Sequence, residues 1–352
     1  MIAGRSPHEV QGFPRVSVGG VPDSPHGRAL SKPTLDIVIV DFDAGVLLRE
    51  CLASVASHPP IFGSLNRVVV VDNASRDPSL RHIQGLTLPV VLIRNEENLG
   101  FAAACNQGAR CSEADYLLFL NPDTRLGKNS LDVPARFLSA VENRDVGIVG
   151  IQLVDNRGRV SPTCRRFPMP SHYWNQTLGL QRISKSRFPT GGMEDWDHGD
   201  PRQVDQVMGA FFFVRSGVFV TLGGFDERFF VYFEEVDFSL RARQAGWRSM
   251  YLSEAQVFHA GCGTTDKVKA RRLFYSLRSR ILYGYKHFNW INATSVLLLT
   301  ALVEPIMRFA WAISRGAWRE AGESARASAM LWISMIKTLQ TAFQLRRWVF
   351  LL

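Results

Sequence analysis

The sequence predicts an α/β protein with a doubly wound, mainly parallel β-sheet, followed by a helical region at the C-terminal end. Two observations predict the sheet. Apolar strand-like runs alternate with helix-like segments four times over about 120 residues, which is the pattern of βαβ units. Three of the predicted strands also end in acidic residues. The helical region is predicted by long basic and apolar stretches after residue 266.

The first half of the chain supplies most of the predicted sheet. Continuous apolar runs predict buried strands at 35–40, 67–71, 90–93, 116–120 and 146–151. Apolar residues at helical spacing predict helices at 46–55, 101–110 and 131–141. Residues 1–32 are rich in Gly, Pro, Ser and Arg without periodicity, which predicts a disordered leader. We therefore expect a leader at 1–32, an α/β domain at 33–265 and a helical region at 266–352.

The strand predicted at 116–120 stops at Asn121-Pro122-Asp123. Pro122 lacks the N–H that a strand pairing requires, so the chain must leave the sheet there. This places Asp123 at the carboxyl end of a central strand, where open α/β sheets bind ligands. Taken alone, the same residues also suit an ordinary turn.

Acidic residues follow two other predicted strands as well. Asp41 and Asp43 end the first strand, and Asp72 ends the second. Acidic side chains that meet at one edge of a sheet suit a divalent cation and the hydroxyls of a nucleoside. A dinucleotide-binding fold is the competing interpretation, but no G-x-G-x-x-G follows the first strand.

A long loop-like stretch at 152–202 opens the second half, and a connection of this length is usually functional. Further on, Glu234, Glu235 and Asp237 begin a predicted helix that Gly246 ends. Favourable interaction with the helix dipole is one explanation for this acidic cluster. The preceding aromatic run gives another, because an apolar environment raises the pKa of a carboxyl toward that of a general base.

Composition restricts the class of partner and compartment. The 352 residues carry a net charge of +9, which indicates an anionic partner. Five cysteines without CxxC spacing argue against a disulfide framework or a zinc ribbon and favour a reducing compartment. The N-terminal residues show no apolar segment of a secretory signal.

Taken in order, these motifs resemble those of the inverting, GT-A fold glycosyltransferases of family 2, of the bacterial rhamnosyltransferase-like kind. The resemblance covers roughly residues 34–263. The matching segments are Asp36–Val40, Val71–Asp77, Asn98–Gly108, Leu120–Thr124, Gly209–Phe211, Gly223–Glu227, Tyr232–Asp237, Arg241, Ala245–Trp247 and His259–Gly261.

The resemblance implies a role for each acidic motif. Asp72 would hold the nucleotide base, and Asp123 would coordinate Mg²⁺ or Mn²⁺ at the donor diphosphate. His259 would approach the same metal, although a lone histidine is more often structural. Asn121 stands where many relatives carry the first Asp of a DxD motif, so one anionic ligand is missing. The segment 261–265 would be a flexible loop over the phosphates.

The catalytic base is implied to be Glu235, which replaces the usual aspartate, and Glu234 and Asp237 remain alternatives. The acceptor side would include Gly209 and Asp226. The residues expected to bind the nucleotide sugar are Val40, Asp41, Asp43, Asp72, Asn73, Asn98, Gly100, Asn106, Asn121 and Asp123.

The C-terminal region combines basic and aromatic residues. Residues 267–286 contain seven Lys and Arg, a pattern that suits a solvated helix or an RNA-binding surface, although no nucleic-acid module is recognisable. No run reaches about 18 uninterrupted apolar residues, so a membrane span is not predicted. Basic amphipathic helices rich in Trp and Phe suit an anionic membrane surface, and a helical bundle packed on protein is the alternative.

We therefore expect a cytoplasmic enzyme that lies peripherally on the inner face of the cytoplasmic membrane and binds no nucleic acid. It would move a sugar, such as the deoxysugar rhamnose, from a nucleoside-diphosphate donor to a glycan or lipid-linked acceptor. The competing functions are nucleotidyl transfer and nucleotide-sugar binding without turnover.

Overall fold

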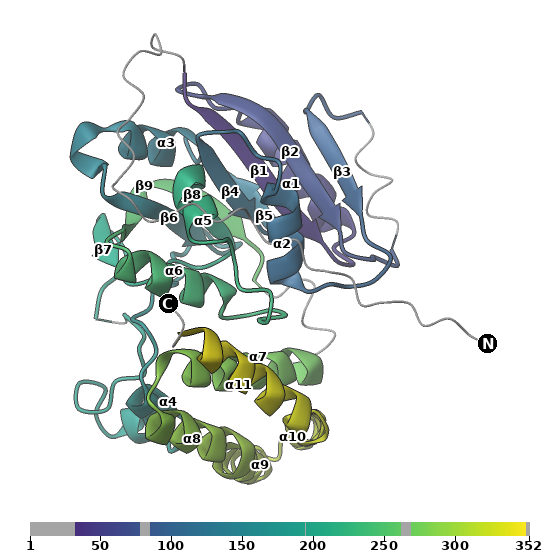
Figure 1. The fold of residues 1–352 in the computed structure, drawn as a ribbon, viewed down its shortest axis with the longest axis vertical. Helices are drawn as coiled ribbons and strands as arrows, with labels where there is room; N and C mark the ends of the chain where they lie inside the picture. The colour runs from purple at the N-terminus through teal and green to yellow at the C-terminus, as the bar shows by residue number, and fades with distance from the viewer. Residues whose placement is uncertain (1–31, 78–84, 194, 262–268, 350–352) are drawn as a thin grey trace.

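The computed structural model describes residues 32–77, 85–193, 195–261 and 269–349. Their centre is a nine-stranded sheet with the order β3-β2-β1-β4-β8-β6-β9-β5, and β7 pairs with β9 (Figure 1). The strands are β1 (Thr34–Asp41), β2 (Ser64–Asp72), β3 (Val90–Arg94), β4 (Tyr116–Leu120), β5 (Thr124–Leu126), β6 (Val146–Val154), β7 (Arg202–Val204), β8 (Phe211–Arg215) and β9 (Arg248–His259).

The sheet is parallel on one side and mixed on the other. Strands β3, β2, β1 and β4 are all parallel, as the alternation of strands and helices predicts. Strand β8 runs antiparallel to both β4 and β6, whereas β6 and β9 are parallel to each other. The chain reaches β8 from the long stretch after β6 rather than through a βα crossover, so the right-handed crossover rule does not fix its direction.

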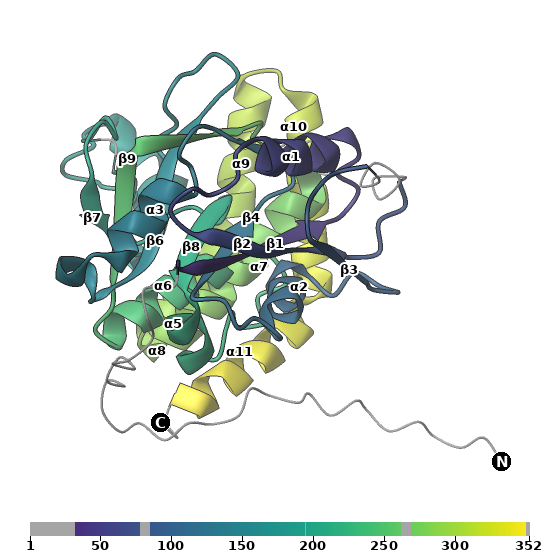
Figure 2. The same ribbon diagram turned by 90° about the horizontal axis from the view of Figure 1, so that it is seen from above.

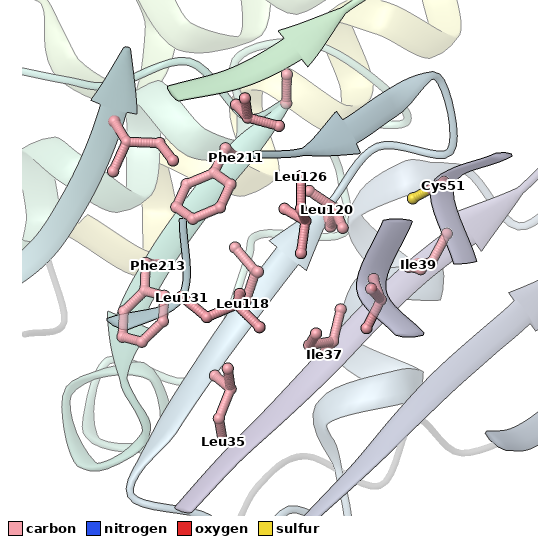
Figure 3. Close-up of a cluster of buried hydrophobic side chains, with 14 of the residues drawn as sticks. Leu35, Ile37, Ile39, Cys51, Leu118, Leu120, Leu126, Leu131, Phe211 and Phe213 are labelled. Atoms are coloured by element: carbon pink, nitrogen blue, oxygen red, sulfur yellow. The ribbon is translucent and has the colours of Figure 1, made fainter. Parts of the chain in front are cut away.

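Helices cover both faces of the sheet (Figures 1 and 2). Two of them, α1 and α3, share a hydrophobic core with alternate residues of β1 such as Ile37 and Ile39 (Figure 3). The other face packs Val38 and Val40 against α2, α5 and α6. Successive strand residues point to opposite faces, so β1 is buried on both. These helices are α1 (Val46–Ser57), α2 (Phe101–Ala109), α3 (Asp132–Ser139), α5 (Ser216–Thr221) and α6 (Glu234–Gln244).

The C-terminal helices form a second layer beneath the sheet, and α4 packs against them (Figure 1). Helix α6 lies between the two layers: Phe238 and Ala242 contact the sheet core, and Val236 belongs to the core of the helical region. The helices of this region are α4 (Pro170–Thr177), α7 (Lys269–His287), α8 (Trp290–Leu298), α9 (Glu304–Ser314), α10 (Trp318–Ile333) and α11 (Met335–Val349).

Helices α8 and α9 are joined by a π-helical turn, Leu299–Val303, into one helix from Trp290 to Ser314. By length and composition this 25-residue helix could cross a membrane, which the sequence did not predict. Glu304 and Pro305 interrupt the apolar run, but neither ends the helix. Pro305 donates no N–H, and the carbonyl of Ala301 four residues earlier accepts instead from Trp332 Nε1, at 2.8 Å.

Glu304 is buried because it is neutralised twice. Arg280 of α7 pairs with one carboxylate oxygen, and Arg308 pairs with the other at 2.6 Å. Burial alone would raise the pKa of Glu304, but these two guanidinium groups hold it below its ordinary value. The pair with Arg280 fastens α9 to α7, and the pair with Arg308 lies within α9; together they explain how a charged residue is accommodated within an apolar helix.

Two predicted segments lie mostly outside the described residues: 1–31 of the predicted leader at 1–32, and 262–265 of the predicted phosphate loop at 261–265. The stretch at 152–202 is mainly irregular, as predicted, but it contains α4, whose Trp174 Nε1 donates to Ser295 Oγ of α8 at 2.9 Å.

Candidate active site

The acidic residues that end β1 and β2 lie side by side. Asp41 and Asp72 are direct neighbours in the parallel register, and the N–H of Asn73 donates to the carbonyl of Asp41 at 2.8 Å. Asp72 accepts a hydrogen bond from the N–H of Ser75, and Asp43 accepts one from the N–H of Arg76. These bonds tie together the loops after β1 and β2, so the two loops form one edge of the candidate site.

An amide network continues this edge toward α2. Asn73 Nδ2 donates to Asn98 Oδ1 at 3.0 Å and to the carbonyl of Gly100 at 3.2 Å. Gly100 has a φ of 90°, and a Cβ there would lie 2.5 Å from the carbonyl oxygen of Phe230. Glycine is therefore required on both conformational and steric grounds. Through this contact the 98–100 turn touches the segment that precedes α6.

Asp123 and His259 come together from distant parts of the chain. The short strand β5 pairs with β9 so that Thr124 faces His259, and His259 Nε2 lies 3.5 Å from Asp123 Oδ1. Both side chains are largely buried. A carboxylate beside an imidazole is a suitable donor pair for Mn²⁺ or Mg²⁺. No group of three or more His, Cys, Asp or Glu side chains suited to a metal occurs within the described residues, so such an ion would need ligands from a substrate or water.

The segment before β8 connects Asp123 with the acidic start of α6. The N–H of Asn121 donates to the carbonyl of Ala210 at 3.0 Å, two residues before Asp123. On the other side, a methyl group placed on Gly209 would lie 3.7 Å from Glu235 Cγ. Gly209 and Ala210 thus lie between the Asp123–His259 pair and the carboxylates of α6.

Glu234 and Glu235 are the least compensated carboxylates of the site. One oxygen of each, Oε2, is buried without a hydrogen-bond partner within the part of the chain that the structure describes. Burial raises the pKa of both residues, and the neighbouring charge of Glu235 raises that of Glu234 further. Burial and these two carboxylates also raise the pKa of Cys105 on α2. The pair therefore retains protons at a pH where ordinary glutamates are ionised.

Asp237, one turn further along α6, has the opposite environment. Its carboxylate lies 2.8 Å from Arg241 Nε, 2.6 Å from Lys286 Nζ and 2.7 Å from His287 Nε2. Burial would raise the pKa of Asp237, but these three groups hold it well below its ordinary value. Lys286 Nζ also lies 2.6 Å from Asp226. The structure thus places Asp226 and Asp237 in an ion-pair cluster with the end of α7.

Two consecutive residues just before α6 have a left-handed backbone. Tyr232 and Phe233 have φ values of 68° and 73°. For residues with a side chain this conformation costs about 1–2 kcal/mol each, and such strain concentrates at functional sites. Phe233 is the N-cap of α6, so this strained pair sets the direction in which Glu234 and Glu235 leave the loop.

Some residues that the sequence predicts to bind the nucleotide sugar instead make hydrogen bonds or packing contacts inside the protein. Asn106 is buried on α2, where it exchanges hydrogen bonds with the backbone of Phe225 and donates to Glu227 Oε1 at 3.0 Å. Val40 is buried in the sheet core. Sequence reasoning missed Lys286 and His287, because it assigned the basic residues of 267–286 to a surface as a group. Nothing in the helical spacing marks which of them reaches α6.

Among the solved structures that share this fold, two have TM-scores of 0.50 or more. The mannosyltransferase PcManGT from Pyrobaculum calidifontis, in complex with GDP-Man and Mn²⁺, superposes with a TM-score of 0.51 and 16% identity, over 91% of this chain and 88% of that one. GalNAc-T7 with UDP, GalNAc and Mn²⁺ gives a TM-score of 0.50 and 17% identity over 73% of this chain, which spans 51% of that protein. The fold is therefore of the GT-A type.

Sequence relatives define the class more narrowly. The family model of glycosyl transferase family 2 matches residues 36–193. The N-acetylglucosaminyl-diphospho-decaprenol L-rhamnosyltransferase of Mycobacterium tuberculosis is 28% identical over 74% of this chain and 87% of its own length. Rhamnosyltransferase WbbL of Escherichia coli is 29% identical over 49% of this chain and 63% of its own length. These matches support a rhamnosyltransferase-like glycosyltransferase similar to family 2, so sugar transfer is favoured over nucleotidyl transfer and over binding without turnover.

Proposed function

We propose that this protein transfers L-rhamnose, with inversion, from a nucleoside-diphosphate donor to a lipid-linked glycan acceptor. The observation that carries the proposal is the placement of two kinds of acidic site around Gly209 and Ala210. The Asp123–His259 pair lies on one side, and the buried Glu234–Glu235 pair lies on the other. The sugar and the lipid-linked acceptor follow from the relatives that carry those substrates in their names.

Glu235 acts as the general base in this proposal. Its raised pKa suits proton abstraction from an acceptor hydroxyl, which then attacks the anomeric carbon as the nucleoside diphosphate leaves. Two carboxyls this close resist ionising together, so one of the pair stays protonated while the other carries the charge, and in this proposal Glu235 is the one that ionises. Asp237 is the weaker choice for a base, because Arg241, Lys286 and His287 already stabilise its charge.

Asp123 and His259 would hold Mg²⁺ or Mn²⁺ in this proposal. When bound, the ion would neutralise charge on the donor diphosphate and on the departing nucleotide. Asp41, Asp43, Asp72, Asn73 and Asn98 form the edge where the nucleoside would lie. The bonds among their loops keep this edge ordered before the donor arrives.

Membrane docking through α8 and α9 accounts for access to a lipid-linked acceptor. This helix exposes large apolar side chains, and Trp311 lies under two guanidinium groups, with Arg182 Cζ at 4.0 Å and Arg315 Cζ at 5.2 Å from its ring centre. Aromatic rings beside cations suit the interface of an anionic membrane, here the inner face of the cytoplasmic membrane. The exposed apolar residues are Trp290, Ile291, Leu298, Leu302, Ile306, Met307, Phe309 and Trp311.

Release of nucleoside diphosphate from a panel of sugar donors tests the proposed reaction. The purified full chain, supplied with Mn²⁺ or Mg²⁺ and membrane lipid extract, is expected to turn over an L-rhamnose donor and to lose that activity in Asp123→Ala. Pyrophosphate release from a nucleoside triphosphate would indicate nucleotidyl transfer instead. Donor binding without release, unchanged in Glu235→Gln, would indicate a binding protein.

Vesicle co-sedimentation tests membrane docking separately. The full chain is expected to sediment with vesicles containing anionic lipid and to remain in solution with neutral ones. Trp311→Ala with Ile306→Asp should abolish sedimentation, whereas Ile61→Asp, an equally exposed apolar residue outside the helical region, should not. Equal sedimentation of both variants would contradict docking through α9.

A further inference from the structure

Helix α7 makes a continuous set of contacts with the loop and helix that carry the catalytic carboxylates. Ser279 Oγ donates to the carbonyl of Val231 at 2.9 Å, directly before the left-handed pair Tyr232–Phe233. One turn earlier, Tyr275 stacks on Phe230, with ring centres 4.7 Å apart and planes inclined by 16°. The strained entry into α6 is therefore held by a helix of the C-terminal region.

The end of α7 holds the first turn of α6 by charge. Lys286 Nζ lies 2.6 Å from Asp226 and 2.6 Å from Asp237, so one ammonium bridges the loop before α6 and α6 itself. The side chains of Lys286, Asp226 and Asp237 are all at least nine-tenths buried. An ammonium between two carboxylates in a site of this kind fixes their separation more strictly than a surface ion pair would.

We propose that Ser279 and Lys286 are positioning residues for sugar transfer, which makes α7 part of the active site rather than only a support for docking. Among the described residues no hydrogen bond or ion pair joins them to Glu234 or Glu235, and they act through the backbone at 231–233 and through Asp237. A left-handed segment persists only where its surroundings hold it, and α7 supplies those surroundings together with Phe101, whose N–H donates to the carbonyl of Phe230 at 2.6 Å. The inference rests on the proposed role of Glu235 as the base.

The test compares Lys286→Met with Lys286→Arg in the full chain. Lys286→Met is expected to lower kcat about 10- to 100-fold, because a small displacement of a catalytic group has effects of that size. The KM for the donor should change less than about twofold, because the nucleotide edge lies on other loops. Lys286→Arg keeps a cation between the two carboxylates and should recover most of kcat.

Arg280→Met is the matched control. Arg280 is a similarly buried cation of α7, but its partner Glu304 lies on α9, away from α6. Both methionine variants should lose thermal stability, whereas only Lys286→Met should lose kcat. If both lose kcat in proportion to stability, or if Lys286→Arg recovers nothing, Lys286 has a general structural role and the proposal is wrong.

Two further variants keep the outcome interpretable. Should Lys286→Met not fold, Ser279→Ala removes a single hydrogen bond and is expected to lower kcat about fivefold with an unchanged donor KM; an unchanged kcat would overturn the proposal. Glu235→Gln separates the two levels of inference. Full activity in Glu235→Gln would contradict the assignment of the base, whereas loss of activity there with a normal Lys286→Met would contradict only the role of α7.

Discussion

The first turn of α6 carries two carboxylate environments of opposite character. Glu234 is buried and Glu235 is half-buried, but one oxygen of each is buried without a hydrogen-bond partner among the described residues, and their pKa values are raised. Asp237 is fully buried, yet Arg241, Lys286 and His287 hold its pKa down. Burial is common to both environments. The supply of counter-charge from α7 and Arg241 therefore decides which carboxyl can exchange a proton and which one is structural.

The largest predicted effect is a loss of kcat when Glu235 is replaced. Glu235→Gln keeps the shape of the side chain and removes its basicity, so kcat should fall by about 10²–10⁴, the usual contribution of a general base. The melting temperature should stay equal or rise, because a buried group with an unfavourable charge is replaced by a neutral one. Steady-state kinetics and calorimetry measure the two effects. If Glu235→Gln kept full kcat, the two carboxylate environments would not correspond to different roles in the reaction.

Asp237→Asn should show the reverse behaviour, with stability as the main loss. It removes one of the two carboxylates that face Lys286 and the carboxylate that pairs with Arg241, and breaking buried ion pairs in this way costs about 3–5 kcal/mol. Denaturant unfolding measures the loss. A fall in kcat as large as that of Glu235→Gln, with unchanged stability, would exchange the roles that we assign to the two residues.

The pH dependence of kcat sharpens the comparison. Glu235 must be ionised to act as a base, so kcat should fall as the pH drops through its raised pKa. The acidic limb should therefore lie above the ordinary glutamate pKa of about 4.3. Glu234→Gln should keep an acidic limb, because Glu235 must still lose its proton before it can act as the base. Loss of the limb in Glu234→Gln would identify Glu234 as the base.

The smallest effect concerns stability in acid. The depressed pKa of Asp237 gives a stabilisation that is present above the unfolded-state aspartate pKa of about 3.9 and is lost as the pH falls below it toward the folded-state value. The difference in unfolding free energy between the native protein and Asp237→Asn should therefore shrink below about pH 4. A difference that stays constant down to pH 2 would indicate that the ion pairs contribute little.

The sequence predicts local structure well where a strong local signal exists. Pro122 fixes the end of β4, and the apolar runs of β1 and β2 are unambiguous, so the acidic edge of the sheet is correctly located from the sequence. The antiparallel direction of β8 is not predictable in this way, because it depends on where a long irregular stretch returns the chain. Likewise, Glu304 and Pro305 make the sequence look as if the helix ends there, although it continues. The residues that bond to this part of the helix, Arg280 and Trp332, are remote in sequence.

The candidate site shows the same division. The acidic start of α6 is predictable because its residues are adjacent in the chain, and the resemblance to family 2 indicates Asp123 and His259. The contacts of Lys286 are not predictable, since one lysine of a basic helix differs from its neighbours only by what it faces. Such contacts depend on the packing of α7 against α6, which no local pattern encodes.

The position of α6 between the sheet and α7 restricts how this protein could be recombined with its relatives. A chimera with its crossover between residues 261 and 269 would take the sheet and α6 from one parent and α7 from the other. Asp226 and Asp237 would then face a foreign helix in place of Lys286. We expect active chimeras only when the exchanged block includes both sides of this contact. The block that must be exchanged as a whole therefore runs from the loop before α6 to the end of α7.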